Sequence, residues 1–70
     1  MTDEEVRAEL RRSVDEAGGI TAWARLHGLS TVWVSRVVHG HNPPTAAVAK
    51  PLGIVRRREV VVGEWWEKAR

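Results

Sequence analysis

The sequence contains no cysteine, which excludes a disulfide framework and cysteine-ligated zinc. Its three histidines, at positions 27, 39 and 41, are not spaced like a metal site, so we expect neither a metal nor a cofactor. No apolar run approaches the ~18 residues of a membrane span, and the N-terminus is too acidic for a signal peptide. We therefore expect a cytoplasmic protein that does not contact a membrane.

The chain also has few residues from which to build a core. Its 70 residues form one domain at most, and a core of this size supplies only about 3–5 kcal/mol of net stability. Domains this small usually need disulfides, a metal ion or self-association, and the composition argues against the first two. Self-association is therefore the expected source of additional stability.

Acidic residues are missing from the middle of the chain, although the net charge is only +2. Residues 18–58 carry six basic residues and no acid, whereas acids outnumber bases in residues 1–17 and in residues 59–70. A basic segment of this kind favours a polyanionic partner, but an ordinary solvated surface explains six charges equally well. Charge alone therefore leaves both interpretations open.

The first predicted helix ends near Ala17. Thr2 and Glu5 have the spacing of a capping box, and acids in the first turn favour the helix dipole. Gly18-Gly19 ends the helix. Apolar residues recur at helical spacing on one face, and they are Val6, Leu10, Val14 and Ala17.

A second, short helix is predicted over about residues 20–27. Its cap is either Gly19 or Thr21, and the sequence does not decide between them. Gly28 stops this helix and supplies the positive φ that a tight turn needs.

A third helix is predicted from a cap at Ser30 to about His39. Valine favours strands, so residue propensity argues against a helix here. Leu29, Val34 and Val37 nevertheless repeat at helical rather than alternating spacing. Spacing therefore decides for the helix.

A fourth, weak helix is predicted over about residues 45–52. Pro43 and Pro44 form the loop before it and favour a helix start just after them, with Thr45 as a candidate cap. Pro51 removes a backbone donor within this helix, so a single distorted turn is an alternative.

The tail, residues 55–70, has the composition of a β-strand. A lone strand cannot satisfy its own backbone, so it forms a hairpin or pairs with a second chain. No Asn-Gly or Asp-Gly turn is present, and we therefore favour a homodimer. Its expected dimerisation residues are Val60, Val62, Trp65 and Trp66. The run Arg56, Arg57, Arg58 either protects a strand edge from aggregation, which we favour, or forms a second phosphate patch.

Two helices joined by a tight glycine turn form a helix-turn-helix, here over residues 20–39. A small residue lies four positions before the glycine, an apolar residue follows it, and two more lie six and nine positions after it. The residues that carry this pattern are Ala24, Gly28, Leu29, Ser30, Val34 and Val37. The unit resembles the DNA-binding domains of Cro and lambda-type phage repressors, and the resemblance covers about residues 18–62.

The resemblance implies a mainly α fold: a four- to five-helix domain in residues 1–54, with a short C-terminal β-strand used for dimerisation. It also implies that the third helix lies in the major groove of double-stranded DNA. The expected base-reading residues are Thr31, Val32, Ser35 and Arg36. Arg36 is the best of them, because its guanidinium can take guanine O6 and N7 together. The expected contacts to the DNA backbone are Thr21, Ser30, Trp33, His39, His41, Asn42 and Lys50.

Three residues depart from the family pattern, one of them Pro51, which disturbs the fourth helix. Ile20 stands where many relatives carry a glutamine that touches DNA, so we assign no base contact there. His27 stands at a position that is usually leucine, and we expect it to be a partly buried packing residue rather than a site.

The leading hypothesis is a sequence-specific transcriptional regulator, a small phage or prophage repressor that binds a dyad operator as a homodimer. The alternative is an antitoxin-like module that masks a partner protein through its C-terminal strand and tryptophans. An enzyme is not expected, because the sequence shows no Ser–His–acid or Gly-rich phosphate arrangement. A chain this short also leaves no room for a domain that binds a small molecule.

Overall fold

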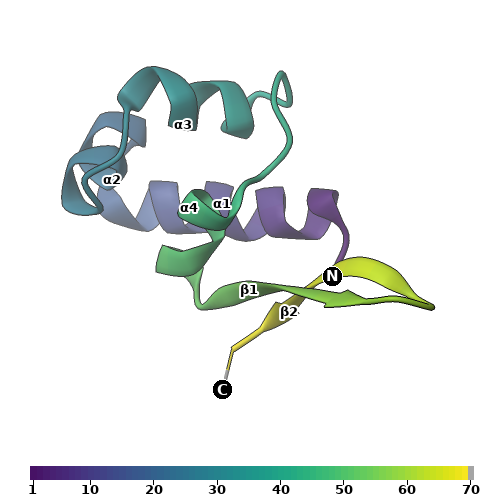
Figure 1. Cartoon of the computed structure of the whole chain (residues 1–70). Coiled ribbons are helices and arrows are strands. Elements are labelled where there is room, and N and C mark those ends of the chain that lie inside the picture. Colours follow the sequence, from purple (N-terminus) through teal and green to yellow (C-terminus); the bar gives the residue numbers. More distant parts are fainter. Residues whose placement is uncertain (70) are drawn as a thin grey trace.

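A computed structural model describes residues 1–69, in which four α-helices precede a two-stranded antiparallel sheet. The elements are α1 (Asp3–Ala17), α2 (Ile20–Leu26), α3 (Thr31–Val38), α4 (Ala46–Ala49), the 3₁₀ helix η1 (Lys50–Leu52), β1 (Ile54–Glu59) and β2 (Gly63–Lys68). α1 lies between α3 on one side and the hairpin of β1 and β2 on the other (Figure 1). Within the described residues, no helix combines the length and the apolar character needed to cross a bilayer.

The ends of α1 are those that the sequence predicts. The Thr2 hydroxyl accepts a hydrogen bond from the Glu5 N–H, and the Glu5 carboxylate accepts one from the Thr2 N–H, which completes a capping box. The Thr2 N–H, and less strongly its hydroxyl, holds the pKa of Glu5 below its usual range, because these bonds favour the charged carboxylate. Gly18 ends the helix with a φ of 96°, a left-handed conformation that a Cβ would strain.

The turn between α2 and α3 is also confirmed. Gly19 is the N-cap of α2, which decides between the two caps that the sequence allows. Gly28 has a φ of 67°, and the Leu29 N–H then donates a 2.8 Å hydrogen bond to the Ala24 carbonyl. His27 is exposed just after α2, so its expected partial burial is wrong, but its ring does pack against that of Trp23, with 4.6 Å between the ring centroids.

The predicted fourth helix divides into two short elements. α4 covers four residues, and η1 continues the chain over three more. Pro51 lies in η1. Because proline has no backbone N–H, it cannot donate the hydrogen bond that would continue an α-helix through this position. Thr45 is the N-cap of α4, although its side chain makes no capping hydrogen bond.

Buried apolar side chains form two clusters, and α1 contributes to both. The larger cluster joins the four helices and consists of Leu10, Val14, Trp23, Ala24, Val34, Val37 and Val48. The second joins the hairpin to α1 and α4, and consists of Val6, Ala49, Ile54 and Trp66. The predicted apolar face of α1 therefore contributes to both clusters, and Ala17 packs against the edge of the larger one.

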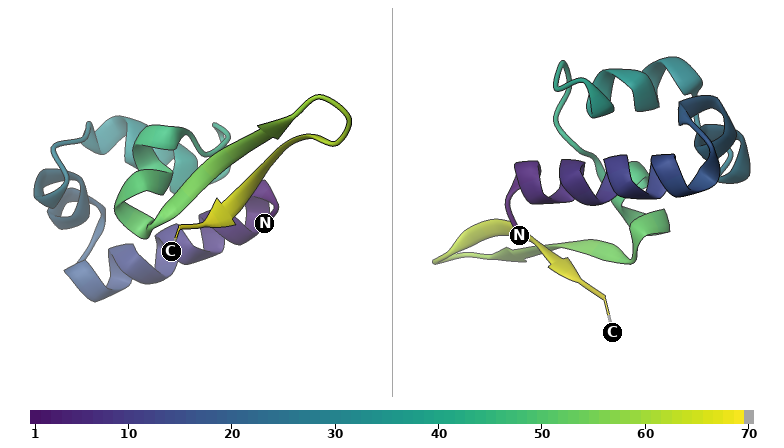
Figure 2. Two further views of the ribbon diagram at one scale, coloured as in Figure 1. Left: turned by 60° about the horizontal axis from the view of Figure 1, so that its bottom comes forward. Right: turned by 180° about the vertical axis from the view of Figure 1, so that it is seen from behind.

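The C-terminal segment pairs with itself, so the expectation of a strand whose backbone pairs with a second chain is wrong. β1 and β2 are antiparallel, with Ile54 opposite Lys68 and Glu59 opposite Gly63. Residues 60–62 form the loop, and Gly63 follows with a φ of 96°. A three-residue loop closed by a left-handed glycine needs no Asn-Gly pair. Figure 2 shows this loop projecting beyond the helices.

Candidate nucleic-acid interface

α3 has one buried face and one exposed face. Val34 and Val37 are fully buried against the other helices. Thr31, Val32 and Arg36 are exposed. Residues four apart on a helix lie on the same side, so Val32 and Arg36 share one outward face. The structure thus brings three of the four predicted base-reading side chains to the solvent side of α3.

The fourth predicted base-reading residue, Ser35, is half-buried and contacts His39. Its hydroxyl lies 3.3 Å from Nδ1 of His39, and its carbonyl lies 2.8 Å from the same nitrogen. The imidazole of His39 therefore folds back on the end of its own helix. The contact of His39 to a phosphate stays a prediction.

The first turn of α3 is fixed by Ser30. Its side-chain oxygen accepts a 3.3 Å hydrogen bond from the Trp33 N–H, which confirms the predicted cap. The Ser30 hydroxyl proton stays free to donate to an acceptor outside the chain. Trp33 keeps 37% of its surface exposed beside this cap. Both residues lie at the N-terminal end of α3, and their contact to DNA stays a prediction.

The remaining predicted backbone contacts lie on three different elements. His41 and Asn42 follow α3, and their N–H groups donate to the Arg36 carbonyl at 2.9 and 3.3 Å, so this loop continues directly from the helix. Thr21 is exposed on α2. Lys50 is exposed in η1, which packs against α1, α4 and β1. Lys50 thus lies on the element that leads into the hairpin, and its contact to DNA stays a prediction.

The acid-free middle of the chain is partly neutralised by residues that follow it. Arg56 and Arg58 of β1 both pair with Glu64 of β2, and Arg57 pairs with Glu67. Arg58, and then Arg56, hold the pKa of Glu64 below its usual range, because positive charge favours the ionised carboxylate. These cross-strand pairs give the three arginines an intramolecular role on the hairpin. Within residues 1–69, the basic residues of the middle segment that form no ion pair are Arg25, Arg36 and Lys50.

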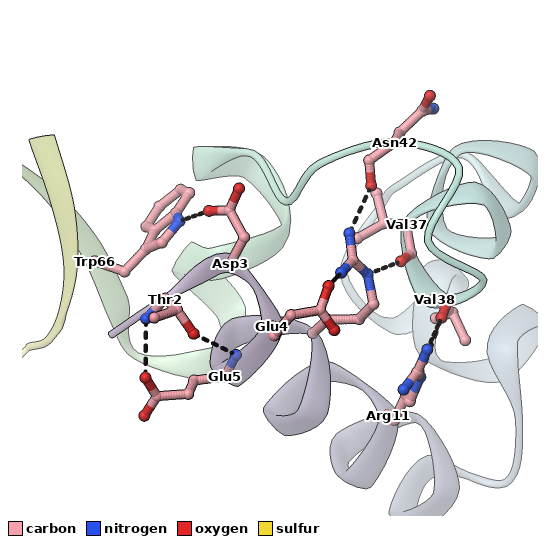
Figure 3. A network of polar contacts seen from close by, with 10 residues as sticks. Thr2, Asp3, Glu4, Glu5, Arg11, Val37, Val38, Asn42 and Trp66 are labelled. Carbon is pink, nitrogen blue, oxygen red and sulfur yellow. Dashed lines mark hydrogen bonds and ion pairs between the residues drawn. The ribbon is translucent and has the colours of Figure 1, made fainter.

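Two arginines that sequence reasoning left without a role hold the far end of α3. Arg7 and Arg11 lie on α1, and their guanidinium groups donate to the carbonyls of Val37 and Val38 (Figure 3). Nothing in the sequence marks these contacts, because they join residues about thirty positions apart and end on backbone atoms. The only local signal is the helical spacing of Arg7 and Glu4, which form an ion pair.

The predicted dimerisation residues fall into two groups. Trp66 is 2% exposed and packs inside its own chain, so its assignment to a dimer contact is wrong. Trp65 lies on the opposite face of the same strand and is half-buried. Val60 and Val62 lie in the hairpin loop at 102% and 68% exposure, with Val61 between them at 89%. The accessible apolar side chains among these residues are therefore those of the hairpin loop and of Trp65.

Comparisons with protein-family profiles, with curated proteins and with solved structures found no match to this chain. Within residues 1–69, no group of three or more His, Cys, Asp or Glu side chains is placed to hold a metal ion.

Proposed function

We propose that the chain is a sequence-specific regulator that binds double-stranded DNA with α3 in the major groove. The observation that carries this proposal is the outward face of α3. Arg36 is exposed there and has no ion-pair partner among the described residues, while Val34 and Val37 fix the opposite face in the core. An unpaired guanidinium on a rigid helix can bind guanine O6 and N7 together.

The turn that joins α2 and α3 supports the same proposal. Ala24 is fully buried where the two helices meet, and a larger side chain there would push them apart. Gly28 and Ser30 then redirect the chain within a few residues. These positions are the ones on which the resemblance to Cro and lambda-type repressors rests. Such a regulator acts where the DNA is, in the cytoplasm of a bacterial host.

We propose further that the regulator is a homodimer, held by the hairpin loop and the Trp65 face rather than by strand pairing. Full-length antiparallel pairing of β1 with β1 of a second copy would set Arg56 opposite Arg57, and like charges in register are destabilising. On β2, the Trp66 backbone already exchanges hydrogen bonds with Met1. The exposed apolar surface that remains on the hairpin is Val60–Val62 and Trp65.

The decisive experiment is selection of bound sequences from a random duplex pool at physiological salt. We expect one enriched motif with dyad symmetry and half-sites roughly 34 Å apart along the duplex. The matched control is a single-stranded pool of the same composition, from which no motif should emerge. A duplex pool without enrichment would contradict the proposal.

The second candidate is an antitoxin-like module that masks a partner protein. The exposed valines of the hairpin loop favour it, because contiguous apolar surface usually marks an interaction site. The two candidates differ in what the valines serve. If the chain is a dimeric regulator, substitution of Val60 and Val62 should weaken dimerisation. If it is a masking module, the same substitution should change neither its oligomeric mass in solution nor its binding to DNA.

A further inference from the structure

The C-terminal end of α3 is held in an unusual way. An α-helix leaves its last four carbonyls without partners inside the helix, and here they belong to Ser35–Val38. The Ser35 and Arg36 carbonyls accept N–H groups of the loop that follows, from His39 and His41. The Val37 carbonyl accepts the Gly40 N–H at 3.2 Å and also an arginine of α1, and the Val38 carbonyl accepts a second arginine of α1.

Arg7 and Arg11, which we call the arginine clamp, make these bonds in complementary ways. Arg7 Nε donates to the Val37 carbonyl at 2.8 Å, and its Nη2 donates to the Asn42 carbonyl at 3.2 Å. Arg11 donates from Nε and Nη2 to the Val38 carbonyl at 3.1 and 2.8 Å (Figure 3). The clamp therefore ties both α3 and the loop after it to α1.

Electrostatics strengthen this arrangement. The C-terminus of a helix carries partial negative charge, and two guanidinium groups lie against it. Arg7 is only 6% exposed, so its positive charge cannot reach a phosphate at the surface. Its contribution to DNA binding has to pass through the position of α3 and of the loop.

We propose that Arg7 and Arg11 are positioning residues, which hold α3 at the angle to α1 from which its side chains read bases. The proposal rests on the function proposed above. The bond from the Leu29 N–H to the Ala24 carbonyl ties the N-terminal end of α3 to α2, and the clamp ties the other end to α1, so both ends resist a tilt or slide of the helix. A binding constellation has to be held within about 0.5 Å and 10–20° of its productive geometry, and small rotations of α3 would move Arg36 beyond that limit.

The test compares Arg7→Met and Arg11→Met with Arg12→Met. All three changes remove one positive charge from α1, but Arg12 is 66% exposed at its side chain and pairs only with Glu9. We expect both clamp variants to lose at least tenfold in affinity for the preferred duplex, about 1.4 kcal/mol, with little change on a random duplex. Arg12→Met should match the wild type on both. Arg11→Lys should recover part of the loss, because lysine keeps the charge without the fork.

A contact between the clamp and phosphates predicts a different pattern. Affinity would then fall equally on both duplexes, and the slope of log affinity against log salt would become shallower by about 0.9 per residue. That outcome would overturn the positioning role. Equal affinity of all variants for the preferred duplex would overturn it as well.

Amide hydrogen exchange in the free protein gives a measurement that does not depend on DNA. The N–H groups of His39, His41 and Asn42 bond to carbonyls at the clamped end of α3, so both clamp variants should exchange them at least tenfold faster. Unchanged exchange in both would overturn the clamp. If the wild type binds no duplex, both the proposed function and the role of the clamp in base reading are wrong. Hydrogen exchange then still decides whether the clamp holds α3 in the free protein. If Arg7→Met does not fold, the exposed Arg11 supplies the variant that decides.

Discussion

The indole Nε1 of Trp66 donates a 2.7 Å hydrogen bond to the carboxylate of Asp3, which joins the end of the chain to its first helical turn. The Trp66 ring is buried against Val6, Ala49 and Ile54, so one residue links the hairpin to the helices by both apolar contact and a polar bond. Buried tryptophans usually need such a partner for their N–H group.

Removal of this link should destabilise the whole domain. We expect Trp66→Ala to lower the free energy of unfolding by about 3–5 kcal/mol, because it leaves a cavity where a large ring was buried. Asp3→Ala should cost about 1 kcal/mol through the lost hydrogen bond. Trp65→Ala, on the opposite face of β2, is the control; at protein concentrations too low for dimerisation it should cost much less, because Trp65 is only half-buried. Urea unfolding measures all three, and equal losses from the two tryptophans would contradict the packing.

Arg36 should carry base specificity. Arg36→Ala is expected to cost about 1–3 kcal/mol at the preferred site and to relax the preference at one base pair in each half-site. Arg36→Lys should recover only part, because it keeps the charge but cannot form the bidentate pair. Affinities for the preferred site and for its single-base variants test this. A loss that is equal for every variant would assign Arg36 to a phosphate and leave Thr31, Val32 and Ser35 as the readers.

Salt should weaken DNA binding, with a log–log slope of about −0.9 for each phosphate that the protein neutralises. Because three of the six basic residues in the middle segment are paired on the hairpin, we expect a shallow slope. Lys50→Ala should make it shallower still while weakening all sequences alike. If neither affinity nor slope changes, Lys50 lies outside the interface. Titration of affinity against salt concentration measures both.

Stability should fall in acid partly through the capping box of α1. The folded-state pKa of Glu5 is lowered, so its stabilisation is complete above the ordinary carboxyl pKa of about 4.3 and is lost as the pH falls through the lowered value. Glu5→Gln should therefore flatten the dependence of the unfolding free energy on pH in this range. Glu16→Gln, at the exposed far end of the same helix, is the control. Parallel pH curves for wild type and Glu5→Gln would refute the link.

The hairpin loop should control association. We expect the doubly substituted Val60→Ser, Val62→Ser protein to dissociate at protein concentrations where the wild type is a dimer, because the loop places three exposed valines side by side. Sedimentation at micromolar concentration is the measurement. Since the valines lie outside both core clusters, the variant should still fold, but it should unfold at a lower urea concentration than the dimeric wild type because association stabilises the folded state. A wild-type protein that stays monomeric at micromolar concentration would contradict the proposed homodimer.

The helices were predictable because their signals are local. Each helix end is fixed by bonds that span a few residues, as at Thr2 with Glu5, at Gly18 and at Gly28. In α3 the helical spacing of Val34 and Val37 outweighs the strand propensity of valine. The hairpin was not predictable from a search for two-residue turns, because its glycine follows three valines rather than lying within a short polar turn.

The electrostatics of the candidate site depend on contacts that a linear window cannot show. Arg56 finds Glu64 only after the chain reverses direction, so the acid-free segment looked more exposed to a polyanion than it is. Arg7 resembles a surface cation that pairs with Glu4, and only the fold brings it to Val37, thirty residues away. Sequence reasoning identified the outward residues of α3 but not what holds α3 in place.

The ion pairs across the hairpin also bear on how such a regulator would search a chromosome. With Arg56, Arg57 and Arg58 engaged by Glu64 and Glu67, few cations are left to hold the protein on DNA of random sequence. The proposed regulator would leave each wrong site quickly, and bulk DNA would sequester little of it. Occupancy of its operator would then follow the number of copies in the cell closely, so that small changes in synthesis become changes in gene control.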